Sequence, residues 1–365
     1  SQGIASVRVL SGTVPTPVRV VATAVDTDTK EVITSQSEQL TVNTGLPQQL
    51  GFSLSTTIFN PEAGDFNGET ATITIRASDS FGNPAPDDTA VNFTTEGGQI
   101  PTSCLTKNGT CSVVWTSQTA RVPDHRITIL AYALGHETFF DTNGNNIFDD
   151  ADVSKDINGT PVPDLACLTN SGVAKKCTGN GMDIEAYLPS GFSDLGDAFR
   201  DDNEDGIRNS AEPFWNTQAK EYSFADGKFN GPQCESALCG KGQANKTYIR
   251  KALVMSMSGS QAYISVMQDG VLLPSVNDIK PVAVGASSEF VVFVHDSANQ
   301  IMPAQTSIEL CVDCAGTPKT FEVPNTVYAK GSLGSPLKFT ASANTSVSVK
   351  VTTPKNVVTD NLGFT

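Results

Sequence analysis

The chain has 365 residues, 17% of them charged, and a formal net charge of −15. Such a length allows two or three domains, and the abundance of Thr, Ser, Val, Gly and Pro favours β-strands and turns. The negative charge argues against nucleic acid and anionic membrane as partners. No apolar run approaches the roughly 20 residues that span a bilayer. Because there is neither a leader sequence nor an initiating Met, we expect a mature product or an excised piece.

Residues 1–46 are predicted to form only three or four short strands, such as Val18–Val25 and Gln39–Val42, in which apolar and polar residues alternate. A β-sandwich needs about seven strands. We therefore expect a partial domain that packs on the next domain or receives its missing strands from another segment or chain. Strand addition by another copy of the chain is one way to complete it.

Residues 47–256 are predicted to form a complete β-domain with a long insertion. Alternating strands are expected at Ala71–Ala77, Ala90–Thr95 and Arg126–Leu134, with Trp115 as a core anchor. The pattern stops near residue 136 and returns near residue 246, so residues 136–245 are read as a loop-rich insertion between the last two strands. Bound metal and disulfides are expected to replace a core there. Residues 257–365 are predicted to form a second full sandwich, and the fold class is all-β.

The stretch Asp201–Glu212 matches the calcium-loop pattern D-x-[DN]-x-[DN]-G-x5-E at every constrained position. The predicted ligands are Asp201, Asn203, Asp205, the Ile207 carbonyl, Asn209 directly or through water, and Glu212 with both oxygens. Gly206 permits the sharp turn, whereas Pro213 argues against a following helix. We therefore expect a calcium loop inside an extended insertion, with an acidic solvated loop as the alternative.

Asp141–Asp152 is a second candidate loop. Its predicted ligands are Asp141, Asn143, Asn145, Ile147, Asp149 and Asp152. Asn146 replaces the turn glycine, a tolerable change because Asn accepts left-handed backbone conformations. Asp226–Gly231 is a fragment of the same pattern, or an ordinary turn, and Asp194 and Asp197 either add ligands or only solvate the main loop. Calcium is favoured over magnesium, which demands near-octahedral geometry.

The eight cysteines form four close pairs: Cys104/Cys111, Cys167/Cys177, Cys234/Cys239 and Cys311/Cys314. Pairing between neighbours is the simplest arrangement, although the sequence alone leaves other pairings open. Such an even set points to an oxidising compartment. Only the last pair has zinc-like or redox-like spacing, and no second pair or strand–helix unit supports either role.

Several motifs resemble bacterial immunoglobulin-like domains of the invasin/intimin type (Big1-like). These are Leu40–Pro47, Phe52–Ser55, Phe81–Asp87, Val91–Gly98, Gly109–Ser117 and Ile127–Ala133. The acidic stretches Asp141–Asn145 and Asp194–Phe199, with Glu212–Phe214, look like the calcium-loop insertions of some members, although Asn146 and Asp152 depart from the usual residues. The resemblance covers about residues 38–256. It implies tandem immunoglobulin-like sandwiches in a secreted or surface-exposed bacterial protein, with residues 1–46 as the last strands of a preceding domain.

We therefore predict an extracellular structural or adhesive protein of a bacterial surface: a calcium-rigidified stalk, an adhesin or a filament subunit. Its partners are expected to be copies of itself, by strand addition, or tandem neighbours, without direct membrane insertion. The host or cell-surface ligand is not specified by the sequence.

The alternative function is a carbohydrate-binding module, in which Phe214, Trp215 and Tyr222 form an aromatic platform beside a calcium ion. The same rings could instead anchor the loop by packing. An enzyme is not expected, because the three histidines lie apart in the sequence and no nucleophile motif is near them.

Overall fold

A computed structural model of the chain describes residues 6–8, 17–37, 40–41, 45–141, 143–153, 166–169, 172–174, 186–187, 191–217, 221–313, 318–343 and 345–364. Within these residues the structure consists of β-strands and two short 3-10 helices, η1 (Gly242–Asn245) and η2 (Val276–Asp278). None of the described helices has the length and apolarity needed to cross a bilayer. The all-β prediction is confirmed.

The central sandwich has a three-stranded sheet in the order β5-β6-β9 and a four-stranded sheet in the order β16-β10-β7-β8. The strands are β5 (Phe52–Thr56), β6 (Thr70–Ala77), β7 (Ala90–Thr95), β8 (Ser103–Leu105), β9 (Thr110–Thr116), β10 (Arg126–Gly135) and β16 (Thr247–Ser256). Alternating apolar residues of both sheets form one core. Trp115 is fully buried there and donates its indole N–H to the Gly97 carbonyl over 2.8 Å, which confirms it as a core anchor.

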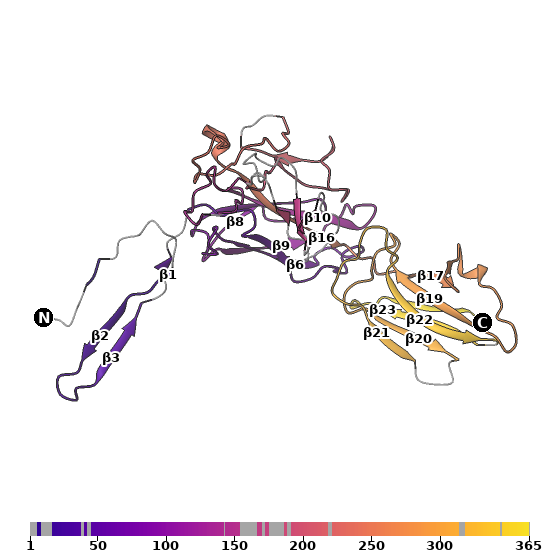
Figure 1. Cartoon of the computed structure of the whole chain (residues 1–365). Coiled ribbons are helices and arrows are strands. Elements are labelled where there is room, and N and C mark those ends of the chain that lie inside the picture. The colour runs from indigo at the N-terminus through magenta and orange to yellow at the C-terminus, as the bar shows by residue number, and fades with distance from the viewer. Residues whose placement is uncertain are drawn as a thin grey trace.

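The C-terminal sandwich also consists of two sheets, here both four-stranded, in the orders β18-β17-β19-β22 and β21-β20-β23-β24. The strands are β17 (Tyr263–Gln268), β18 (Val271–Leu272), β19 (Ser287–His295), β20 (Ser307–Val312), β21 (Lys319–Glu322), β22 (Ser335–Ser342), β23 (Val347–Thr352) and β24 (Val358–Phe364). A second core of alternating apolar residues fills the space between its sheets. The two sandwiches lie end to end (Figure 1).

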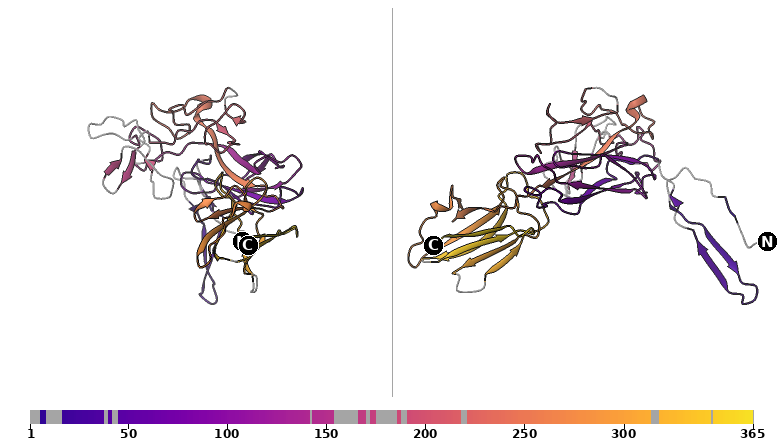
Figure 2. Two further views of the ribbon diagram at one scale, coloured as in Figure 1. Left: turned by 90° about the vertical axis from the view of Figure 1, so that its right-hand side faces the viewer. Right: turned by 180° about the vertical axis from the view of Figure 1, so that it is seen from behind.

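The N-terminal strands form a hairpin that stands apart from both sandwiches (Figures 1 and 2). In this hairpin β1 (Pro17–Val18) pairs with β4 (Leu40–Thr41), and β2 (Val21–Val25) pairs with β3 (Val32–Gln36). Every residue of β2 and β3 is exposed, including Val21, Val25, Val32 and Ile33. This hairpin therefore has no covering layer in the described part of the chain.

The insertion leaves the central sandwich after β10 and returns at β16, whose ten residues pair with β10. Its described strands are β11 (Ala166–Thr169), β12 (Gly172–Ala174), β13 (Ala186–Tyr187), β14 (Ala198–Phe199) and β15 (Phe214–Trp215). The insertion lies over the four-stranded sheet (Figure 1), and Arg250 of β16 donates to the Gly196 carbonyl over 2.8 Å. As a result β10 is buried on both faces, with Ile129 in the core and Leu130 on the opposite face.

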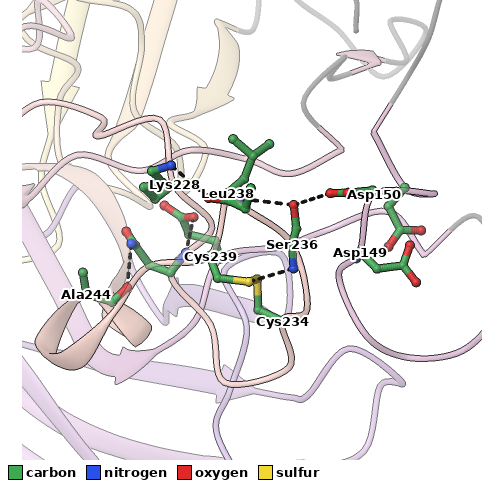
Figure 3. Close-up of a disulfide and its surroundings, with 12 residues drawn as sticks. Asp149, Asp150, Lys228, Cys234, Ser236, Leu238, Cys239 and Ala244 are labelled. Carbon is green, nitrogen blue, oxygen red and sulfur yellow. Dashed lines mark hydrogen bonds between the residues drawn. A yellow bond between two sulfur atoms is a disulfide. The ribbon is translucent and has the colours of Figure 1, made fainter. Parts of the chain in front are cut away.

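The insertion also has a small core that the sequence analysis did not anticipate. Four phenylalanines pack together: Phe139, Phe148, Phe192 and Phe229. The Cys234–Cys239 disulfide borders this cluster, and Ser236 between the two cysteines donates its hydroxyl to Asp150 over 2.7 Å (Figure 3). Apolar burial therefore supports this segment together with the covalent bond.

Two of the predicted disulfides are confirmed, Cys104–Cys111 and Cys234–Cys239. The first joins β8 and β9, which belong to different sheets, across a turn in which Asn108 and Gly109 have φ values of 50° and 69°. Positive φ at both residues is the conformation that Asn-Gly favours in tight hairpins. Cys311 is also disulfide-bonded. Cys177 and Cys314, the predicted partners in the remaining pairs, lie outside the described residues.

Candidate metal centre

The loop Asp201–Glu212 is closed at its base by a short antiparallel pair, in which Phe199 of β14 lies opposite Phe214 of β15. The two strands bring the ends of the loop together. Gly206, at the predicted turn, has a φ of 78°, and the space around its α-carbon is open. Only a residue that tolerates a left-handed conformation fits there, as the sequence pattern requires.

Within the loop, main-chain N–H groups orient the predicted ligands. The Asp201 carboxylate accepts hydrogen bonds from Asp205 N at 3.2 Å and Gly206 N at 2.8 Å. Asn203 Oδ1 accepts from Asp205 N at 3.1 Å, and Asp205 Oδ1 accepts from Ile207 N at 2.7 Å. Ile207 is 67% exposed, and its aliphatic side chain carries no donor atom, so only its main-chain oxygen can serve as a ligand.

Glu212 closes the loop. It is 3% exposed, and its two oxygens accept separate main-chain hydrogen bonds, from Asp202 N at 3.1 Å and Asn209 N at 2.9 Å. Each oxygen therefore keeps acceptor capacity for a further partner. The position of this carboxylate is determined by both ends of the loop.

Loop Asp141–Asp152 has the same hydrogen-bond scheme, although its sequence departs at two positions. The Asp141 carboxylate accepts from Asn145 N at 3.1 Å and Asn146 N at 2.8 Å, and Asn145 Oδ1 accepts from Ile147 N at 2.8 Å. Asn146 has a φ of 64°, so it adopts the left-handed conformation expected of it.

The shorter closing acid of this loop is also in place. Asp152 is 2% exposed and accepts a hydrogen bond from Asp149 N at 3.0 Å, as Glu212 does from Asn209 in the other loop. Asn143 and Asn145 point their amide nitrogens at the Asp149 carboxylate, at 3.1 and 2.8 Å. The two loops therefore share one pattern of internal hydrogen bonds among the predicted ligands.

A third copy of the scheme is assembled from three separate stretches. The Asp194 carboxylate accepts from Asp226 N at 3.2 Å and Gly227 N at 2.7 Å, and Gly227 has a φ of 71°. Glu137 takes the closing position, because its oxygens accept from Leu195 N at 2.6 Å and Asn230 N at 2.8 Å. The sequence pattern marks Asp194 and the fragment at Asp226, but not Glu137, which follows β10 and carries no local signal.

Glu137 is fully buried. The pKa of Glu137 is raised to about 8, chiefly by burial; the hydrogen bonds from Asn230 and Leu195 oppose this rise, and repulsion from the carboxylates of Asp194 and Asp226 contributes to it. Burial also raises the pKa of Asp194, and repulsion from Asp226 adds to this. A buried carboxylate between two others is costly unless a proton or a cation offsets the charge.

The donor sets consist of carboxylate, amide and main-chain oxygens, without sulfur or imidazole. No group of three or more His, Cys, Asp and Glu side chains converges on one point in the described part of the chain. Each loop instead mixes acids with Asn side chains and main-chain groups. An all-oxygen set of this kind suits a hard cation such as calcium. The residues therefore fit the ion that the sequence pattern predicts.

The three aromatic residues of the proposed sugar platform are engaged in packing. Trp215 stacks on Tyr132 of β10, with ring centroids 4.9 Å apart. The Arg208 guanidinium lies 4.8 Å from the Phe214 ring centroid and 5.0 Å from that of Tyr222. The Trp215–Tyr132 stack attaches the loop to the four-stranded sheet, and the Arg208 contacts hold Phe214 and Tyr222 within the insertion, which favours the anchoring interpretation.

The histidines are held in structural contacts. His295 Nδ1 lies 2.8 Å from the Asp296 carbonyl and its Nε2 lies 2.9 Å from Ser265 Oγ. Since the carbonyl can only accept, His295 donates to it and accepts from Ser265 when neutral. His136 Nδ1 is within 2.7 Å of the Glu137 carbonyl, and burial lowers the pKa of this histidine. His125 contacts Asp296 across the two sandwiches.

Comparisons with known proteins identify no family for the chain. No family model matches it, and no curated protein matches it. One solved structure with a similarity is the Yersinia pseudotuberculosis adhesin InvE, at 9% sequence identity and a TM-score of 0.23. The match covers 88% of this chain and 60% of that one, so the chain spans less than two thirds of the adhesin structure.

Proposed function

We propose that the chain is part of an extracellular structural or adhesive protein built from tandem immunoglobulin-like sandwiches and rigidified by calcium. The observation that carries this proposal is the shared hydrogen-bond scheme of loops Asp141–Asp152 and Asp201–Glu212, which differ at the turn and closing positions. Because two different sequences form the same hydrogen-bond scheme, we infer that both loops bind the same kind of ligand. The disulfides Cys104–Cys111 and Cys234–Cys239 fit an oxidising compartment.

Calcium would act on the insertion as a folding element. In its absence the clustered carboxylates repel one another, and their electrostatic repulsion opposes loop closure. A bound cation reverses the sign of that interaction and couples binding to folding. The insertion covers the β10–β16 sheet, so a rigid insertion also protects the outer face of the central sandwich. The role is structural and involves no catalytic step.

Thermal unfolding with and without a chelator tests the proposal. Removal of calcium is expected to lower the unfolding midpoint by several degrees, since a ligand at a hundredfold excess over its Kd stabilises by about 2.7 kcal/mol per site. Calcium, added back, should restore the midpoint, and calorimetric titration should give two to three sites. An unchanged midpoint together with no heat of binding would refute calcium binding.

We also propose that the exposed hairpin β2–β3 is completed by strands of another copy or of a tandem neighbour. The supporting observation is that all residues of both strands are exposed, although isolated two-stranded hairpins are marginal in water. Sedimentation analysis tests self-association: assemblies that dissociate in the Thr23→Pro/Thr34→Pro variant support addition between copies. A chain that stays monomeric at high concentration argues against that route.

A further inference from the structure

The two sandwiches are joined by directed polar contacts. Asn60 is fully buried and donates its side-chain amide to the carbonyls of Met302 at 2.9 Å and Pro324 at 3.1 Å. Glu62, which is 4% exposed, accepts from Thr353 Oγ1 at 2.6 Å and Lys355 N at 2.9 Å. The central sandwich therefore presents buried polar groups whose partners lie in the C-terminal sandwich. We call the region in which the C-terminal sandwich contacts the central sandwich and its insertion the joint.

Arg126, the first residue of β10, is 3% exposed and connects three parts of the molecule. Its Nε and Nη2 donate to the two oxygens of Glu204 at 2.6 and 2.7 Å. Its Nη1 donates to Gln300 Oε1 at 3.1 Å and to the Tyr328 carbonyl at 2.8 Å. One guanidinium group thus joins β10, the candidate calcium loop and the C-terminal sandwich. A bidentate pair with a carboxylate sets its orientation.

The main chain of the same loop contacts both sandwiches. Thr128 Oγ1 of β10 donates to the Asp201 carbonyl at 2.7 Å. Lys330 Nζ of the C-terminal sandwich donates to the Asn203 carbonyl, also at 2.7 Å. Asp201 and Asn203 accept main-chain hydrogen bonds within the loop through their side-chain oxygens, while their carbonyls accept from β10 and from the C-terminal sandwich. Glu204, between the ligand positions, has a φ of 59°, so its side chain turns away from the loop centre toward Arg126.

We propose that loop Asp201–Glu212 is a latch on the joint, and that a divalent cation held in this loop stiffens the joint between the two sandwiches. The cation part of this inference rests on the proposed calcium binding. A cation bound by Asp201, Asn203 and Asp205 would fix the main-chain conformation at Glu204, which lies between them. When the loop opens, Arg126 loses the Glu204 carboxylate that orients it, and its hydrogen bonds to Gln300 and Tyr328 weaken.

The test measures amide hydrogen exchange of the joint peptides 297–303 and 325–332, and of the loop itself, on the full chain with calcium and with chelator. Glu204→Gln removes the charge opposite Arg126 without touching a predicted ligand. Lys330→Met removes the second contact at a half-exposed site, where misfolding is not a concern. Glu221→Gln, an exposed acid of the insertion, is the matched control. Calcium binding to each variant is measured separately by calorimetric titration.

In the parent chain, chelation is expected to speed exchange of the joint peptides about tenfold, the change expected for loss of one charge-assisted hydrogen bond. Glu204→Gln and Lys330→Met should show faster joint exchange even with calcium bound, while Glu221→Gln behaves like the parent. If both variants bind calcium and keep parental joint exchange, the latch is refuted. If the parent binds no calcium, the proposed function fails, and the effect of Glu204→Gln still decides whether the loop braces the joint.

Discussion

The contact between His125 and Asp296 predicts a pH dependence of stability. His125 Nδ1 lies 2.7 Å from Asp296 Oδ2, and the side chains of the two residues are 16% and 0% exposed. The hydrogen bond to Asp296 raises the pKa of His125, with smaller contributions from Asp65 and Asp124, while burial acts in the opposite direction. Asp296 also accepts a hydrogen bond from Gly259 N at 2.9 Å. The ion pair therefore lies inside the joint.

The direction of the pH dependence follows from the raised pKa of His125. Protonated His125 is favoured in the folded state, so its stabilisation is complete below the unfolded pKa of about 6.5 and is lost as pH rises through the folded pKa. A hydrogen bond to a charged group contributes about 1.5–3 kcal/mol and a neutral one about 0.5–1.5 kcal/mol. The pH-dependent part is thus about 1–1.5 kcal/mol, the difference between the corresponding ends of these ranges.

The assay compares the parent with His125→Asn by urea unfolding at several pH values from 5.5 to 9, with excess calcium. Asn suits this position because His125 has a φ of 56°, which Asn tolerates, and its shorter side chain falls short of Asp296. The parent should be more stable than His125→Asn at low pH, and this difference in the free energy of unfolding should become smaller as pH rises. His136 and His295 are present in both proteins, so they do not contribute to the difference in stability between them. A gap that stays constant over this pH range would refute the assignment.

Three further tests address the core and the insertion. Gly98→Ala should lower the free energy of unfolding in urea by at least about 2 kcal/mol, because Gly98 has a φ of 73° and an added Cβ would lie 2.6 Å from Trp115 Nε1. Gly68→Ala is the control, because Gly68 has a φ of 86° but open space around it, and it should cost only about 1 kcal/mol. Replacement of both Cys234 and Cys239 by Ser should cost about 2 kcal/mol for so short a loop, seen as faster proteolysis within 221–245; an unchanged rate would mean that the aromatic cluster alone holds this segment. Trp215→Ala should lower the unfolding midpoint through loss of the Tyr132 stack and leave glycan-array binding unchanged, whereas lost glycan binding at full stability would favour the carbohydrate-binding alternative.

Local patterns in the sequence were sufficient for the strands and for two of the candidate loops. Two-residue alternation predicts strands such as β6 and β10 because one face of a sheet meets a core. The predicted ligands of Asp141–Asp152 and Asp201–Glu212 lie within twelve consecutive residues, so their spacing alone predicts the turn and the hydrogen-bond scheme that both loops adopt. The Asn146 exception was also predictable, since left-handed conformations are a property of the residue itself. Neighbouring cysteines such as Cys234 and Cys239 follow the same local logic.

Contacts between distant stretches could be decided only by the tertiary structure. Glu137 completes the third hydrogen-bond scheme because the end of β10 lies beside Asp194 and Asp226, and nothing in its own sequence surroundings marks it. Arg126 looks like an ordinary strand-entry residue until the insertion and the C-terminal sandwich place Glu204 and Gln300 against it. Local spacing reports which residues share a turn or a strand face. Which faces become buried together depends on the packing of whole layers, and that packing determined the joint and its latch.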